Sequence, residues 1–366
     1  MESKRKLIVD AHLDLGMNAV EWNRDLRLPV QEIRKRESGM VDKLDRGRNT
    51  VSLPALREGN VGLVVATQLA RYVASGRPDD GDPYWNSPEI CWSITQAQRS
   101  YYKVMEDLGE MVQITGKNDL LEHVECWLKE DAADDNSKPV GYILSLEGAD
   151  SLVNIGFLEK AYAYGLRAIG VSHYGQGRYA GGSGTESGFT AKGRELLREM
   201  DNLDMILDVT HLTDLGFKEA ITLYKGPIWA SHHNCRTVIS GQRQLSDDQL
   251  RILIDREAVI GGALDNWMLA ESWIRGVDDP FMRNVGLERL IDHYDHICQL
   301  AGNSLHCAIG SDLDGMYGTE QSPYDLDTIA DMQKLSGLLQ RRGYGEDDID
   351  NIFYGNWIRF MEASLP

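Results

Sequence analysis

Eight short apolar runs recur along the chain, and longer stretches of amphipathic pattern separate them. Most of the runs are continuously apolar, as is typical of strands buried on both faces of a parallel sheet. The pattern therefore predicts eight buried strands, at Leu7–Ala11, Val61–Thr67, Val140–Leu146, Arg167–Ser172, Met205–Val209, Pro227–Ala230, Val259–Ala263 and His306–Gly310.

The intervals between these runs predict helices. The segment Ser246–Ala258 begins with a serine that can cap a helix and has acidic residues in its first turn. Strands alternating with helices predict an α/β fold, a (β/α)8 TIM barrel, with a doubly wound open sheet as the alternative. The other predicted helices are Pro88–Met111, Leu158–Tyr164, Thr190–Met200, Asp214–Leu223 and Leu287–Leu300.

The length and net charge of the chain bear on the number of domains and on the partners it can bind. The chain has 366 residues, of which 42% are hydrophobic, and shows neither an internal repeat nor a domain boundary. We therefore expect residues 1–366 to form one domain, as α/β barrels of this size often do. The formal net charge of −19 is spread along the chain and repels phosphate backbones, so we expect no nucleic-acid partner.

The cysteines and the apolar segments indicate the cellular compartment of the protein. The five cysteines are scattered without a Cys-x-x-Cys pair, which indicates reduced thiols. The apolar stretch near the N-terminus is too short for a signal peptide, and no apolar run is long enough to span a bilayer. We therefore expect a cytoplasmic protein without a membrane partner.

Histidines and acids follow the predicted strands. Each histidine alone is more often a hydrogen-bonded loop residue than a ligand, but five of the nine directly follow an apolar run. A closed barrel would arrange them around one mouth, whereas an open sheet would spread them along a line, so the set favours the barrel. The residues at the strand ends are His12, Asp14, Glu147, His173, His211, His232, His233, Asp312 and Asp314.

Imidazole and carboxylate groups are the natural ligands of zinc-like ions. His12 and Asp14 point to the same side of an extended segment and can hold one ion. His211 and His232 could hold a second, and Glu147 is suited to bridging. Two ions about 3.5–4 Å apart can share a bridging water and lower its pKa toward about 7. The residues thus predict a site for two zinc-like ions, either Zn²⁺ or other divalent transition metals.

Two further patterns have less specific interpretations. His293 and His296 share a helical face, which fits a metal clamp but more simply a surface pair, because no other ligand candidate is near in sequence. The glycine-rich stretch Tyr174–Gly188 lacks a following Gly-Lys-Ser/Thr, so a flexible substrate loop is favoured over a phosphate site.

As an ordered set, the motifs resemble those of the membrane (renal) dipeptidase family, zinc metallopeptidases of the amidohydrolase superfamily. The similarity extends over nearly the whole chain, including the segments Leu53–Gln68 and Leu338–Phe360. The motifs that carry it are His12-x-Asp14, Glu147-Gly148, THLTD around His211, SHHNCRTV around His232 and GSDLDG around Asp312.

The resemblance implies a barrel of the metal-dependent hydrolase type that cleaves dipeptides through a metal-bridging hydroxide. Members of such families often form homodimers. In this sequence the resemblance assigns one zinc ion to His12, Asp14 and Glu147, and the other to Glu147, His211 and His232.

The resemblance also implies three catalytic or substrate-binding roles. His173 matches the histidine near the scissile carbonyl, and Asp312 matches the acid that shuttles a proton. Arg243 matches the arginine that receives the substrate's C-terminal carboxylate, with Arg236 as a second candidate.

The sequence departs from the family pattern at three places that shape the pocket. They are YGQGRYAGG after His173, His233 where a small serine is common, and GALDNWM after the seventh strand. These departures motivate a second interpretation, a hydrolase of N-acyl amino acids or another small amide. A third, a barrel that binds without catalysis, is disfavoured by the complete ligand set.

Overall fold

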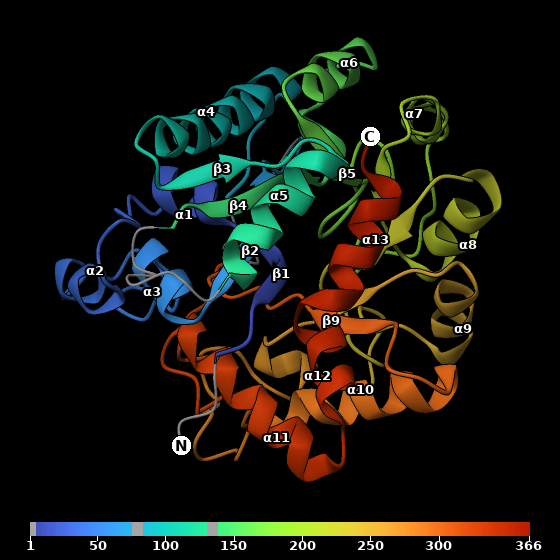
Figure 1. The fold of residues 1–366 in the computed structure, drawn as a ribbon. Helices are drawn as coiled ribbons and strands as arrows, with labels where there is room; N and C mark the ends of the chain where they lie inside the picture. Colours follow the sequence, from blue (N-terminus) through green and yellow to red (C-terminus); the bar gives the residue numbers. More distant parts are fainter. Residues whose placement is uncertain (1–4, 75–82, 130–137) are drawn as a thin grey trace.

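The computed structural model describes residues 5–74, 83–129 and 138–366, so the first four residues of the N-terminal segment lie outside it. A curled parallel sheet occupies the centre, and helices surround it (Figure 1). Its strands are β1 (Ile8–Leu13), β2 (Val61–Leu69), β3 (Met111–Gln113), β4 (Val140–Glu147), β5 (Leu166–Gly170), β6 (Ile206–Asp208), β7 (Ile228–Trp229), β8 (Ile260–Gly262) and β9 (Cys307–Ile309).

The strands follow one another around the barrel. Hydrogen bonding gives the order β1-β2-β4-β5-β6-β7, and β8 pairs with β9. A parallel bridge between Ala230 and Ile260 connects β7 to β8. The carboxylate of Asp10 on β1 accepts hydrogen bonds from the backbone nitrogen of Ser311, at 2.8 Å, and from the Ser311 hydroxyl, just after β9. The arrangement is of the TIM-barrel type, which confirms the predicted fold class.

All eight predicted strands are present, with bounds that differ by a few residues. The sequence missed β3, which pairs with the start of β4 outside the ring. The predicted helix Pro88–Met111 ran too far, because α4 ends at Asp107, Gly109 adopts φ +72°, and Met111 begins β3.

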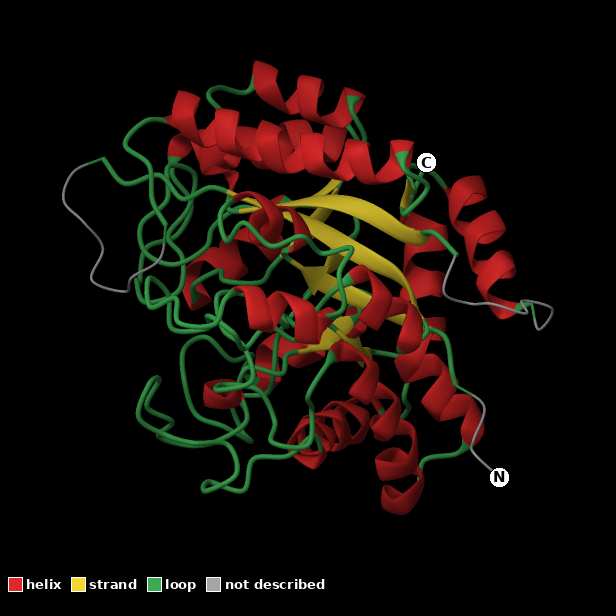
Figure 2. Cartoon of the chain, turned by 90° about the vertical axis from the view of Figure 1, so that its left-hand side faces the viewer, coloured by secondary structure: helices red, strands yellow, loops and turns green. Residues whose placement is uncertain are grey.

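Helices and loops cover the sheet. Figure 2 shows the long loops gathered mainly on one side of the barrel. The helices are α1 (Leu15–Val20), α2 (Val30–Arg36), α3 (Leu53–Glu58), α4 (Pro88–Asp107), α5 (Lys117–Leu128), α6 (Gly156–Ala163), α7 (Ala191–Asn202), α8 (Asp214–Leu223), α9 (Asp247–Asp255), α10 (Glu288–Ala301), α11 (Lys334–Arg342), α12 (Glu346–Asp350) and α13 (Asn356–Ser364), with short turns η2 (Ala149–Ser151), η3 (Asn266–Met268), η4 (Ile329–Gln333) and η5 (Asn351–Gly355).

Local sequence signals begin several helices. The Ser246 hydroxyl accepts a hydrogen bond from the backbone nitrogen of Gln249, and the Gln249 side chain accepts one from the Ser246 nitrogen. This reciprocal capping box starts α9 where the sequence predicted it. At the other end of the chain, α13 packs on the barrel, and the Trp357 indole donates to the carbonyl of Ile309 in β9.

The two histidines of α10 do not form a surface pair, so that prediction is wrong. His293 is buried, and its Nδ1 accepts a hydrogen bond of 3.0 Å from the backbone nitrogen of Cys235. His296 instead pairs with Asp247 at 2.8 Å. Packing of α10 against the barrel turns the first ring inward, which sequence spacing alone does not reveal. Among the described residues, no helix is long and apolar enough to cross a membrane.

We predict that Asp10→Ala destabilises the barrel. It would leave buried donors of Ser311 and His12 without an acceptor, which is expected to lower the free energy of unfolding by about 3 kcal/mol. Denaturation in urea measures this change. Asp10→Asn keeps an acceptor and serves as the milder control. If Asp10→Ala lowered the free energy of unfolding by less than about 0.5 kcal/mol, the hydrogen bonds of Asp10 would not be what joins β1 to the turn after β9.

Candidate metal centre at the strand ends

Side chains from five strands converge at the carboxyl ends of the barrel. His12 lies on β1 and Glu147 ends β4, whereas His211, His232 and Asp312 follow β6, β7 and β9. A cavity of about 430 Å³ opens beside them. Of the predicted site residues, those that line the cavity are Asp14, Glu147, His173, His211, His232, Arg243 and Asp312.

Glu147 lies between His12 and the pair His211 and His232. Its Oε2 lies 3.5 Å from Nε2 of His12. Its Oε1 lies 3.1 Å from Nε2 of His211 and 3.4 Å from Nε2 of His232. Gly148 follows with φ +76°, a left-handed conformation that suits glycine and turns the chain away directly after Glu147. Each carboxylate oxygen thus faces a different set of nitrogens.

The ligand atoms form overlapping groups compact enough to hold ions. In each group, all ligand atoms lie within 4.8 Å of one another. From Nε2 of His12, the nearest oxygens of Asp14 and Asp312 each lie 3.8 Å away. The groups are His12–Asp14–Glu147, Glu147–His211–His232 and His12–His232–Asp312. The first two coincide with the predicted ligand sets.

Hydroxyl groups orient the three histidine rings. Nδ1 of His211 lies 3.0 Å from the Ser183 hydroxyl, and Nδ1 of His232 lies 3.0 Å from that of Ser231. Nδ1 of His12 lies 3.5 Å from the hydroxyl of Thr67. Each ring therefore directs Nε2 at Glu147, as metal-binding histidines do when their second nitrogen is held by a neighbour.

Sequence analysis missed these three hydroxyl residues. Ser231 immediately precedes His232, so the motif itself carried a signal. Ser183 comes from the glycine-rich stretch that the sequence assigned to a flexible substrate loop. Within that stretch Tyr174 lines the cavity, while Ser183 supports His211.

The residues present fit divalent metal ions. Nε2 of His12 and Oδ1 of Asp14 are buried in the described part of the chain without a hydrogen-bond partner. Leaving buried polar atoms unpaired is costly, and a cation beside them would satisfy both. The donor set of imidazoles and carboxylates suits zinc and similar ions.

Buried carboxylates raise the pKa of His12. Burial alone lowers it, but Glu147, Asp14 and Asp312 outweigh that effect and raise it to about 10. The pKa values of His211 and His232 are held well below the usual range, first by burial and then by nearby positive groups, among them Arg243. These two rings are therefore neutral at pH 7, as ligands must be.

Burial raises the pKa of Asp312 well above its ordinary value, and the nearby carboxylates of Glu147 and Asp14 raise it further. An acid in this condition can hold a proton near neutral pH and release it. Asp312 also adopts φ +59°, a strained conformation for a non-glycine residue. Such strain at a cavity wall is common at functional sites.

The structure distinguishes between the candidate arginines. Arg243 lines the cavity, and its Nη2 donates to the carbonyl of His232 at 3.0 Å. Its Nε and Nη1 are buried and have no hydrogen-bond partner among the described residues. Arg236 instead pairs with Asp214 at 2.7 Å. His173 lines the cavity, with Nε2 4.0 Å from Oε1 of Glu147.

His233 and Asp314 belong to none of the three ligand groups found among the described residues. Both ring nitrogens of His233 are buried without a partner in the described part of the chain. Asp314 accepts hydrogen bonds from Thr50 and Val51. The departure GALDNWM does shape the pocket, because Asp265 and Trp267 line the cavity.

A TIM-barrel-type fold with a histidine–carboxylate cluster at its strand ends is typical of metal-dependent hydrolases. Residues 3–364 match the family described as membrane dipeptidase, peptidase family M19. The chain therefore belongs to this family and is a metallopeptidase of the dipeptidase class, as the sequence motifs indicated.

The chain is similar to several known proteins. A protein of Klebsiella pneumoniae encoded in the 5′ region of pqqA is 29% identical over 62% of this chain and 82% of its own length. Dipeptidase 3 of Rattus norvegicus is 23% identical over 93% of this chain, which spans 64% of the rat protein. A metallopeptidase of Rhodobacter sphaeroides, solved with a phosphinate mimic of L-Ala-D-Ala, has a TM-score of 0.75 at 22% identity and matches over 99% of this chain and 100% of its own.

We predict that metal binding releases protons. Because the pKa of His12 is about 10 in the metal-free structure, its ring is charged at pH 7 and must lose a proton to bind an ion. Calorimetric titration of metal-depleted protein with Zn²⁺, in buffers of different ionisation enthalpy, should show release of about one proton or more per chain. Zinc affinity should therefore rise with pH. Binding without proton release would contradict this charge state.

Proposed function

We propose that the protein is a binuclear zinc dipeptidase. The observation that carries the proposal is the position of Glu147, whose Oε2 faces His12 while its Oε1 faces His211 and His232. This is the arrangement that a carboxylate bridging two ions requires. We take residues 1–366 as one barrel domain, placed in the cytoplasm, whose partner is a dipeptide and which can form a homodimer.

Five residues would hold the ions. His12, Asp14 and Glu147 would hold one, and Glu147, His211 and His232 the other. When bound, a zinc pair polarises an amide carbonyl and lowers the pKa of water, which supplies the electrophile and the nucleophile for amide hydrolysis.

Asp312 is suited to transfer the proton. Its carboxylate lines the cavity, lies 3.8 Å from Nε2 of His12, and has a raised pKa. We propose that Asp312 takes a proton from the attacking water and gives it to the leaving amine.

His173 and Arg243 would position the substrate. His173 lines the same cavity and can donate a hydrogen bond to the carbonyl oxygen as negative charge develops there. Two nitrogens of Arg243 have no hydrogen-bond partner within the described part of the chain, so this side chain can pair with the substrate's terminal carboxylate.

A second candidate substrate class is N-acyl amino acids, which share the amide and the terminal carboxylate. The observation that favours it is that Asp265 and Trp267, from the segment that departs from the family pattern, line the cavity. A dipeptide library and a panel of N-acyl amino acids, each assayed with and without zinc, separate the two. Zinc-dependent turnover of dipeptides supports the proposal, and turnover confined to N-acyl substrates contradicts it.

We predict that Asp312→Asn removes the proton shuttle. The variant should keep its zinc content, while kcat for a good dipeptide falls about 10²- to 10⁴-fold. Elemental analysis and steady-state kinetics on the same preparation measure both quantities. Asp255→Asn, at the end of α9, is a control outside the described cavity lining and should leave kcat unchanged. Near-normal turnover by Asp312→Asn would remove the shuttle role.

We predict that Arg243→Met discriminates between free and amidated substrates. Loss of the charged pair should reduce kcat/KM for ordinary dipeptides about 10²-fold, and C-terminally amidated dipeptides should be hydrolysed poorly by both proteins. Equal rates of the unaltered protein on free and amidated dipeptides would exclude Arg243 from substrate binding. Arg236→Met, whose side chain pairs with Asp214, is the matched control.

A further inference from the structure

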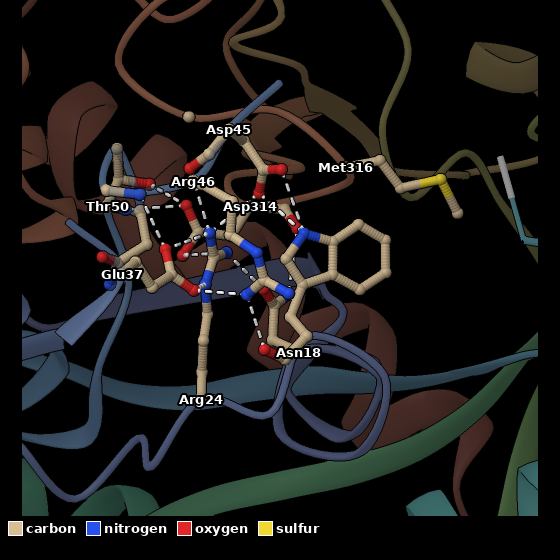
Figure 3. A network of polar contacts seen from close by, with 12 residues as sticks. Asn18, Arg24, Glu37, Asp45, Arg46, Thr50, Asp314 and Met316 are labelled. Atoms are coloured by element: carbon tan, nitrogen blue, oxygen red, sulfur yellow. Dashed lines mark hydrogen bonds and ion pairs between the residues drawn. The ribbon is translucent and has the colours of Figure 1, made fainter. Parts of the chain in front are cut away.

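A polar network joins Asn18, Arg24 and Asp314 (Figure 3). Its central residue is Asn18, on α1. The Asn18 amide donates to the backbone carbonyl of Asp14 at 3.0 Å and to that of Asp314 at 2.9 Å. One side chain thus connects the turn after β1 to the turn after β9.

The turn after β9 is strained and needs such support. Asp312, Asp314 and Met316 have φ angles of +59°, +61° and +66°. Each left-handed non-glycine residue costs free energy and persists only where neighbours hold it. The Asp314 carboxylate accepts hydrogen bonds from the backbone nitrogen of Thr50 at 2.7 Å and from that of Val51 at 3.0 Å. These bonds fix the side chain, and the bond from Asn18 fixes the Asp314 backbone.

Arg24 fixes the orientation of Asn18. Its Nη1 donates to Oδ1 of Asn18 at 2.7 Å, so the amide nitrogen is turned toward the two carbonyls. The guanidinium is itself held, since Nε lies 2.9 Å from Glu37 and Nη2 lies 2.9 Å from Asp45. The Arg24 side chain is 0% exposed. A buried guanidinium with this many partners has little freedom to move.

We propose that Asn18 and Arg24 are positioning residues of the metal centre: by tying the backbones of Asp14 and Asp314 together, they set where the carboxylates of Asp14 and Asp312 stand beside His12. The inference rests on the proposed function, in which Asp14 is a zinc ligand. The inference adds to the proposed site two residues, Asn18 and Arg24, that would act through Asp14 and Asp314 rather than by contacting an ion or the substrate.

The hydrogen bonds of Asn18 matter because the carboxylates of Asp14 and Asp312 belong to separate turns, one after β1 and one after β9. The nearest oxygens of Asp14 and Asp312 both lie 3.8 Å from Nε2 of His12. Zinc–oxygen bonds require about 2.0–2.2 Å and tolerate deviations of only about 0.2 Å. A small shift of the turn after β1 is therefore expected to weaken the Asp14 ligand, whereas His211 and His232 come from other strands.

The test is stepwise titration of metal-depleted protein with Co²⁺, followed by the absorption of the bound ion, for the unaltered chain and Asn18→Asp. This substitution keeps the size of the side chain and its acceptor for Arg24, but removes both side-chain donations. The Asp14 carbonyl keeps its bond from the backbone nitrogen of residue 18, whereas the Asp314 carbonyl loses its bond from this residue. It also adds negative charge, which by itself would tighten cation binding. Weaker binding therefore reports lost positioning rather than charge.

We expect Asn18→Asp to bind one ion as the unaltered chain does and the second about 10- to 100-fold more weakly. Arg24→Lys should show the same selective loss, because lysine cannot hold Asn18, Glu37 and Asp45 together. The matched control is Arg46→Lys, in the same network but bonded to Glu37 and Asp42, which should bind both ions normally.

The outcomes are distinguishable. Normal binding of both ions by Asn18→Asp and Arg24→Lys overturns the positioning role. Equal weakening of both ions, or the same loss in Arg46→Lys, also overturns it, because the effect would then be general destabilisation. If the unaltered chain binds fewer than two ions, the proposed binuclear centre is wrong, and with it the positioning role.

Discussion

The structure depends on one buried carboxylate that faces His12 with one oxygen and His211 and His232 with the other. Burial opposes the ionisation of Glu147, yet His12 and His173 hold its pKa well below the ordinary value. The same cavity contains Asp14 and Asp312, whose pKa values are raised chiefly by burial. So many acids in one buried place need compensating positive charge, and the histidines supply it only in part. Divalent cations between these groups are the simplest way to balance the charge and satisfy the unpaired atoms.

Two residues of the metal cluster adopt a left-handed backbone conformation. His211 has φ +67° and Asp312 has φ +59°, although neither is glycine. The turn that leads to His211 is held by Asp208, whose carboxylate accepts from the backbone nitrogens of Thr210 and Ser231 at 3.0 and 3.1 Å. Asp10 acts similarly between β1 and β9. Buried carboxylates at the strand ends thus fix the turns that carry the cavity residues.

The features that could be predicted from the sequence are those that depend on neighbouring residues along the chain. The eight strands of the barrel are buried on both faces and therefore appear as continuous apolar runs, whereas β3 has three residues, is only partly buried and lies outside the ring. The histidines and acids of the cluster were predictable because they lie at or just after the ends of those runs, whereas Arg243 was indicated only by the family resemblance. Ser231 lies beside His232 and could have been noticed, but Asn18 and Ser183 have remote partners: the bond between Asn18 and Asp314 spans 296 positions, and that between Ser183 and His211 spans 28. The pattern of hydrophobic and polar residues along the chain does not reveal contacts between residues so far apart.

The central claim is that Glu147 bridges two ions. Anomalous X-ray diffraction at the zinc edge, from crystals of zinc-loaded protein, tests it most directly. The account predicts two peaks about 3.5–4 Å apart, one on each side of the Glu147 carboxylate. One peak alone, or peaks that lie away from Glu147, would contradict it.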